Sequence, residues 1–111
     1  MQLTDSIWLV GSGAGGFSMT QPRDCHVYLV ADRGEAVLID AGAGVDVDPI
    51  LALIDRSGVP RSAVGHILLT HAHADHSGGA AALRTALNAQ VLASPEVASY
   101  LHCSATCRCE A

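Results

Sequence analysis

Short apolar runs separated by turn-forming residues recur along the first hundred residues of the chain. Each run has the length typical of β-strands in globular proteins. The pattern predicts five strands, at residues 6–10, 25–31, 35–39, 65–69 and 90–93. The second and third strands are joined by Asp32-Arg33-Gly34, which is typical of a tight hairpin turn.

Helical spacing of apolar residues and helix-ending signals predict helices between the later strands. The clearest helix spans residues 49–57, with Asp48 before it as the predicted N-cap and Gly58 after it as the stop. Further helices are predicted at 80–87, which is rich in alanine, and at 94–101. Strands that alternate with helices in this way indicate an α/β (α+β) fold class.

Three of the six histidines lie within residues 71–76, directly after an apolar strand. If the extended backbone continues through His73, side chains two residues apart point to the same side, so His71 and His73 can bind one cation. Asp75 and His76 are adjacent, so they diverge and offer a second ligand pair. Two pairs would serve two metal ions about 3.5–4 Å apart, and a single-metal site is the simpler alternative.

The other explanation of this segment is a fortuitous histidine-rich surface loop. A cluster of neutral histidines with an embedded aspartate has no evident role as plain surface, so we favour the metal site. The flexible pair Gly78-Gly79 then leads into the predicted alanine-rich helix, which places the second ligand pair on a loop that opens a helix.

Residues 68–79, Leu-Leu-Thr-His-Ala-His-Ala-Asp-His-Ser-Gly-Gly, resemble the T-H-x-H-x-D-H-x-G-G signature of the metallo-β-lactamase fold hydrolases. Residues 37–42 are similar to the family's strand that ends in Asp-x-Gly, and residues 26–30 are similar to the strand before it. The resemblance covers most of residues 6–101, and the glycine pair is most similar to the glyoxalase II-like branch. It implies the N-terminal half of an αββα sandwich, with a mixed sheet and helices on one face.

The resemblance also implies a role for each site residue. His71 and His73 would bind a first metal ion, and Asp75 and His76 would bind a second. Zinc is the expected ion, one or two per chain, although His/Asp sites also accept iron or manganese. Asp40 would accept the N–H of a metal-bound imidazole and fix its orientation. From the residues alone, Asp40 could equally cap the turn that follows its strand.

The implied function is metal-dependent hydrolysis of a small-molecule substrate. A metal-activated water would attack a thioester, lactone, β-lactam or other ester, with a thioester as the first expectation and with Asp75 orienting the water or accepting its proton. The family supplies further metal ligands from a second half of similar size, whereas His102 is the one histidine that follows His76 here. The alternative is a truncated, catalytically inactive metal-binding fragment that needs a partner, a complementing second half or self-association.

Composition narrows the partners and the location. The chain of 111 residues carries 11 acidic residues against six arginines, a net charge of −5, which argues against a nucleic-acid-binding surface. The apolar runs are too short for a membrane-spanning helix, and the N-terminus lacks the features of a signal peptide. We therefore expect a cytoplasmic protein with reduced cysteines, in which residues 1–101 form a partial domain.

Three further features have alternative explanations. Residues 11–16 match the G-x-G-x-x-G of dinucleotide-binding folds, but the required helix would have to fit in residues 17–24, which contain Pro22, so we expect a flexible loop that could flank a substrate. Residues 102–111 hold three of the four cysteines without the paired spacing of zinc sites. We therefore expect either a disordered tail or a segment that results from truncation or a shift of the reading frame. Cys25 is expected to be a small core residue within a strand.

Overall fold

The computed structural model describes residues 1–101, which form a five-stranded mixed sheet with helices. The strands are β1 Ile7–Gly11, β2 Val27–Asp32, β3 Glu35–Ile39, β4 Val64–Leu68 and β5 Gln90–Leu92, in that order across the sheet. The helices are α1 Asp48–Ser57, a 3₁₀ turn at Arg61–Ala63, α2 Ala74–Ser77, α3 Ala80–Leu87 and α4 Pro95–Leu101. Strands β1, β2 and β3 pair antiparallel, and β3, β4 and β5 pair parallel, so the predicted mixed sheet is confirmed.

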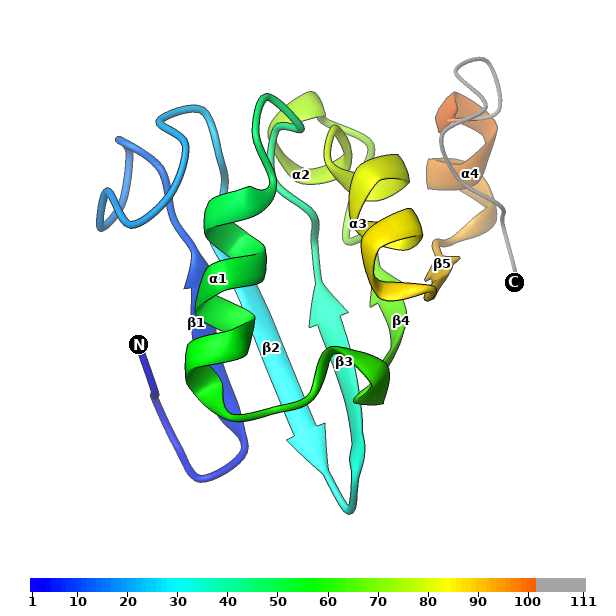
Figure 1. Cartoon of the computed structure of the whole chain (residues 1–111). Coiled ribbons are helices and arrows are strands. Elements are labelled where there is room, and N and C mark those ends of the chain that lie inside the picture. Colours follow the sequence, from blue (N-terminus) through cyan, green and yellow to red (C-terminus); the bar gives the residue numbers. More distant parts are fainter. Residues whose placement is uncertain (102–111) are drawn as a thin grey trace.

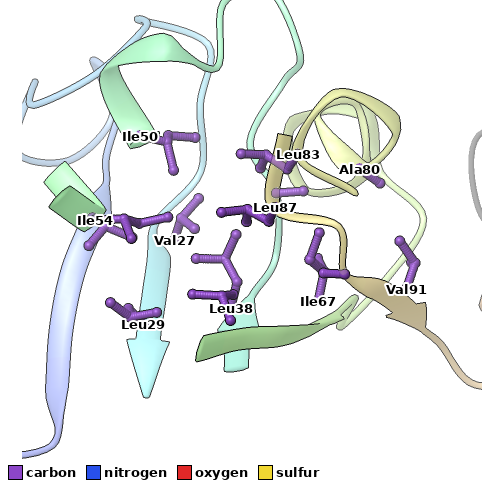
Figure 2. Close-up of a cluster of buried hydrophobic side chains, with 14 of the residues drawn as sticks. Val27, Leu29, Leu38, Ile50, Ile54, Ile67, Ala80, Leu83, Leu87 and Val91 are labelled. Carbon is purple, nitrogen blue, oxygen red and sulfur yellow. The ribbon is translucent and has the colours of Figure 1, made fainter. Parts of the chain in front are cut away.

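Helices α1 and α3 lie against the same face of the sheet, as predicted (Figure 1). One row of side chains that are in register across four strands forms the floor of this core, and each is at most 1% exposed: Leu29, Leu38, Ile67 and Val91. Ile54 of α1 and Leu83 of α3 are also buried in this cluster (Figure 2). Each such side chain contributes roughly 1.5–3 kcal/mol by its burial, so this layer stabilises the frame that carries the site.

The opposite face of the sheet carries apolar side chains that stay partly exposed. Because side chains alternate along a strand, residues next to the buried row point to this second face. Val37 and Ile39 of β3 are half-buried there, and Leu68 of β4 is 40% exposed. The fold therefore presents one helix-covered face and one partly open apolar face.

One edge of the sheet collects the segments that carry the predicted chemistry. Strands β1, β3 and β4 end at this edge and β2 begins there, so the loops 12–26, 40–47 and 69–73 come together (Figure 1). In parallel strands the carboxyl ends share an edge, and this is where ligand sites of α/β sheets form. The topology thus brings the histidine-rich segment beside residues 30 or more positions earlier in the chain.

Strand β2 begins two residues later than predicted. The Cys25 N–H donates to the Asp75 carbonyl at 3.2 Å rather than to a neighbouring strand, so residues 24–26 bend away from the sheet. Cys25 is buried at 9% exposure, so the prediction of a core residue is confirmed while the prediction of a strand position is wrong. This bend ties the start of β2 to the loop that carries the predicted metal ligands.

Helix α1 starts one residue earlier than predicted. Its N-cap is Val47, and Asp48 is the first helical residue rather than the cap. The Asp46 carboxylate accepts the N–H of Asp48 at 3.0 Å, so a side chain two residues upstream satisfies an N–H at the helix start. Gly58 ends the helix, as predicted, and its φ of 86° makes it a left-handed C-cap.

The β2–β3 hairpin contains a conformational cost that a substitution should remove. Arg33 and Gly34, the two central residues, have φ of 54° and 82°, which is the requirement of a type I′ turn. Positive φ is energetically unfavourable for arginine, whereas asparagine tolerates it. We expect Arg33→Asn to raise the free energy of unfolding by about 0.5–1 kcal/mol, measured by urea denaturation. Arg23→Asn is the control, because Arg23 is exposed and does not have positive φ. It should change the free energy of unfolding by less than about 0.5 kcal/mol. Equal effects of the two substitutions would contradict the explanation.

Two remaining predictions concern membrane-spanning helices and the C-terminal segment. Within residues 1–101, none of the helices has the length and apolar character needed to cross a membrane. The predicted cysteine-rich tail, residues 102–111, lies outside the described residues.

Candidate metal centre

The three histidines of the motif meet at the end of β4. The ring centroid of His71 lies 4.9 Å from that of His73 and 3.7 Å from that of His76. His73 has an extended backbone, φ −58° and ψ 142°, which lets it share a side with His71. The structure therefore brings together the imidazoles that the sequence indicates as candidate ligands.

A single helical turn returns the chain to the first histidine. Helix α2 holds Asp75 and His76, and its N-cap is His73. The buried Ser77 hydroxyl is within hydrogen-bond distance of the carbonyls of Ala72, at 3.0 Å, and His73, at 3.1 Å, which tightens the loop. Asp75 Oδ2 lies 3.6 Å from His76 Nε2, so the two residues of the predicted second ligand pair are neighbours.

Asp40, at the end of β3, anchors this cluster from behind. Its side chain is buried, at 5% exposure, and Oδ2 accepts a hydrogen bond from His76 Nδ1 at 2.9 Å. Oδ1 accepts the Thr70 backbone N–H at 2.8 Å, and the Thr70 hydroxyl donates to Oδ2 at 2.7 Å. Asp40 thus contacts a candidate ligand, as the resemblance implies, and it also stabilises the turn after β4 rather than the turn that follows its own strand.

These hydrogen bonds fix which nitrogen of two histidines faces the site. An ionised carboxylate only accepts, so His76 keeps its proton on Nδ1 and leaves the lone pair of Nε2 free. Thr70 gives its single hydroxyl proton to Asp40, so it accepts from His71 Nδ1 at 2.9 Å and leaves the Nε2 lone pair of His71 free as well. Thr70 is part of the motif, but sequence reasoning gave it no role.

The donor set fits a transition-metal ion. Imidazole nitrogens with a carboxylate oxygen are the ligands that zinc takes in catalytic sites, and iron or manganese also accept them. His73 makes no side-chain hydrogen bond within residues 1–101, so both of its ring nitrogens are open to a ligand. His71, His73, Asp75 and His76 would therefore hold the ion, and Asp40 and Thr70 would orient two of them.

A second grouping of potential ligands lies behind the first. Cys25, Asp40 and His76 have ligand atoms within 4.8 Å of one another. Burial, with smaller contributions from the nearby carboxylates of Asp40 and Asp75, raises the pKa of the Cys25 thiol to about 12, against the opposing effect of a backbone hydrogen bond at Gly42. Because Asp40 Oδ2 already accepts a hydrogen bond from His76 Nδ1, this grouping orients the candidate ligand His76 from behind.

Close packing, rather than the predicted flexibility, explains why residues 78 and 79 are glycines. Both have ordinary helical φ, −59° and −84°. A Cβ on Gly78 would lie 2.1 Å from the Ala43 carbonyl oxygen, and a Cβ on Gly79 would lie 2.0 Å from the Ala41 carbonyl oxygen. The pair therefore lets the loop after β3, which carries Asp40, approach the loop that carries His76.

Removing the charge of Asp40 should weaken the site without unfolding it. In Asp40→Asn an amide nitrogen replaces one carboxylate oxygen, so either the Thr70 backbone N–H, which Oδ1 accepts, or the His76 and Thr70 side-chain donors, which Oδ2 accepts, lose their acceptor. Asparagine also tolerates the positive φ of this position, 66°. We expect zinc affinity to fall about 10–100-fold, measured by competition with a chromogenic chelator. Asp32→Asn in the exposed β2–β3 turn is the control, and unchanged affinity in Asp40→Asn would contradict this role.

Two hollows flank the cluster. One, of about 600 Å³, is bordered by His71 and His73 and by Glu96 and Tyr100 of α4. The other, of about 310 Å³, lies between Asp75-His76 and the glycine-rich segment 11–16. Residues 12–26 form turns without a helix, so the dinucleotide explanation is wrong and the predicted loop is confirmed.

Comparison with known proteins identifies the family. The model of the metallo-beta-lactamase superfamily matches residues 20–103. A hydroxyacylglutathione hydrolase of Anaeromyxobacter dehalogenans is 51% identical over 71 residues, which are 63% of this chain and 25% of that protein. An atrochrysone carboxyl ACP thioesterase of Aspergillus terreus is 34% identical over 73 residues, 64% of this chain and 21% of that protein. The chain thus spans about a quarter of the length of these relatives or less.

Solved structures agree with the sequence relatives. The Rm3 metallo-beta-lactamase superimposes with a TM-score of 0.71 and 33% identity, covering 86% of this chain and 32% of that one. A metallo-beta-lactamase of Cronobacter sakazakii with a HARLDQ motif superimposes with a TM-score of 0.76 and 26% identity, covering 91% of this chain and 36% of that one. Because the family model matches most of the residues, the chain belongs to the metallo-beta-lactamase superfamily.

Proposed function

We propose that this chain provides the metal-binding half of a hydrolase that cleaves thioesters. The observation that carries the proposal is the convergence of three imidazoles and the Asp75 carboxylate, with the Nδ1 atoms of His71 and His76 already bound to Thr70 and Asp40. The hydrogen bonds to Nδ1 leave the Nε2 lone pairs of His71 and His76 available to a cation.

The relatives support a thioester among the possible substrates. Two of them bear names that specify an acylglutathione hydrolase and an ACP thioesterase. The similar solved structures are β-lactamases, so a β-lactam, and more distantly a lactone or another ester, remain the competing substrates. The smaller hollow beside Asp75 suits a small acyl group, whereas the larger hollow beside α4 suits the bulkier thiol group that carries the acyl group.

Different residues of the chain would bind the metal ion and orient the attacking water in such a reaction. When bound, a divalent cation lowers the pKa of a water ligand from 15.7 to about 7 and polarises the substrate carbonyl. His71, His73, Asp75 and His76 would hold zinc, one or two ions, with iron or manganese as alternatives. The Asp75 side chain is half-exposed, so its carboxylate is placed to orient the attacking water or to accept its proton.

A second candidate is a metal-binding chain without turnover, which needs a partner to supply further ligands. The observation that favours it is the partly open apolar face of the sheet, where Val37, Ile39 and Leu68 remain accessible. Apolar surface of this kind promotes association with another segment or a second copy. Sedimentation of the purified chain would report self-association directly.

One experiment separates the two candidates. Purified chain is analysed for metal by elemental analysis, and the same sample is assayed for hydrolysis of a thioester and of a β-lactam. One or two ions per chain with thioester turnover would support the proposed hydrolase. Substoichiometric metal without turnover would favour the chain that needs a partner, and faster turnover of the β-lactam would reject the thioester assignment.

A further inference from the structure

The smaller hollow beside Asp75 and His76 contains an exposed histidine that the metal-site assignment does not use. His26 follows the bend at Cys25 and lines this hollow together with Gly16 of the loop after β1. The loop and α2 lie at the same edge of the sheet (Figure 1). His26 therefore borders the space next to the candidate metal ligands, although it comes from a segment about 50 residues earlier.

A buried serine holds the ring of His26. Ser12 is completely buried, and its hydroxyl oxygen lies 3.0 Å from His26 Nδ1 and 2.7 Å from the Phe17 backbone nitrogen. The Phe17 N–H donates to this oxygen, so the hydroxyl proton must find an acceptor elsewhere. Within residues 1–101 its other hydrogen-bond partner is His26 Nδ1, so the Ser12 hydroxyl donates to Nδ1. Neutral His26 then carries its own proton on Nε2.

Contacts with three further residues restrict the orientation of the ring. The His26 ring centroid lies 5.7 Å from that of Phe17 and 6.3 Å from that of Tyr28. A Cβ on Gly16 would lie 2.4 Å from both His26 Cε1 and the Ser12 hydroxyl oxygen, so only glycine leaves room for this pair. An exposed surface histidine needs no such arrangement, whereas a donor aimed at a ligand does.

We infer that His26 is a catalytic residue that donates a hydrogen bond from Nε2 to the carbonyl oxygen of the acyl group bound in this hollow. The inference rests on the proposed function and deepens it, because it assigns the smaller hollow to the acyl side of the substrate. Negative charge develops on that oxygen as water attacks, and a donor whose geometry is set beforehand stabilises the charge. Ser12 acts through His26 and is a positioning residue.

The first test requires neither metal nor turnover. Nitrogen-15 NMR of the imidazoles in the full chain, recorded at about pH 8 where an ordinary histidine is neutral, distinguishes a protonated ring nitrogen from an unprotonated one. We expect His26 to be protonated on Nε2 and Ser12→Ala to reduce that preference. A proton on Nδ1 of His26 in the unsubstituted chain would overturn the inference, whatever the metal content.

The second test measures binding of a short carboxylate that resembles the acyl product. Lactate is titrated into the full chain with and without zinc, and the imidazole signals of His26 are followed. We expect His26→Phe, which keeps the ring and loses the donor, to weaken lactate binding about three- to tenfold, the loss typical of one hydrogen bond. His26→Gln places an amide N–H near the Nε2 position and should recover most of it.

The controls separate this inference from the proposed function. Zinc content should be the same in both His26 variants, so loss of zinc would contradict the assignment of His26 to the substrate. Gly16→Ala should weaken lactate binding like His26→Phe, whereas Gly15→Ala, whose Cβ would meet nothing within 4 Å, should not. Equal binding by His26→Phe and the unsubstituted chain, or no lactate binding at all, would overturn the inference. A chain that binds no zinc but binds lactate through His26 would contradict the proposed function alone.

Discussion

The double replacement His71→Ala with His73→Ala is expected to abolish tight zinc binding. It removes the two imidazoles that leave β4 together, so the remaining Asp75 and His76 offer fewer than the three protein ligands of a catalytic zinc site. We expect affinity to fall by more than about 100-fold, beyond the loss that follows removal of an orienting partner. A ligand present at 100 times its dissociation constant stabilises a protein by about 2.7 kcal/mol, so the zinc-induced rise in melting temperature should disappear.

The matched control for this variant is His66→Ala. His66 lies on β4 itself, is half-buried like His71, and borders a different surface hollow with Gly65 and Val37. It should keep the zinc-induced stabilisation and the metal stoichiometry. If His71→Ala with His73→Ala retained the stoichiometry of the unsubstituted chain, the assignment of the metal centre would fail.

Most strands and helices could be predicted because their signals are local. The apolar runs of β3 and β4 and the amphipathic pattern of α1 determine their own conformation, and their core residues pack as the pattern implies. The error at the start of α1 involves Asp46, only two residues upstream, whereas the error at the start of β2 involves a hydrogen bond to a distant residue. Cys25 leaves the sheet because the carbonyl of Asp75, 50 residues later, accepts its N–H, and no local pattern contains that information.

For the candidate site, too, the locally encoded residues could be predicted and the long-range contacts could not. His71, His73, Asp75 and His76 could be found from sequence because one short segment carries them all. The role of Thr70 depends on the parallel pairing of β3 with β4, which places the Asp40 carboxylate beside it. The family resemblance indicated Asp40 itself, but nothing in the spacing of residues indicated the hydrogen-bonded path from Asp40 through Thr70 to His71.

His26 and Ser12 show a further limit of sequence reasoning. The segment 11–16 matched a dinucleotide motif by spacing, and the physical reason for Gly16 emerged from a contact with a residue ten positions later. The interaction of Ser12 with His26 brings together the two sides of the loop between β1 and β2. Such pairs depend on the path of an irregular loop, for which hydrophobic patterning gives no prediction.

Gly79→Ala should produce a large loss of stability. Its Cβ would lie 2.0 Å from the Ala41 carbonyl oxygen, and backbone at the end of β3 cannot move away as a flexible side chain can. Overpacking of this kind costs typically 1–3 kcal/mol and occasionally more, and we expect about 3 kcal/mol here. For a domain of this size that corresponds to a fall in melting temperature of roughly 10–20 °C, measured by calorimetry or circular dichroism.

The same variant should also weaken metal binding, because displacement of Ala41 moves the neighbouring Asp40 away from His76. Gly65→Ala is the matched control: its Cβ would meet nothing within 4 Å, so its stability should stay within about 0.5 kcal/mol of the unsubstituted chain. If both variants had the same melting temperature as the unsubstituted chain, the glycine pair would be the flexible linker that the sequence suggested. If Gly79→Ala lost stability but kept full zinc affinity, the close approach of the two loops would serve the fold alone and not the position of Asp40.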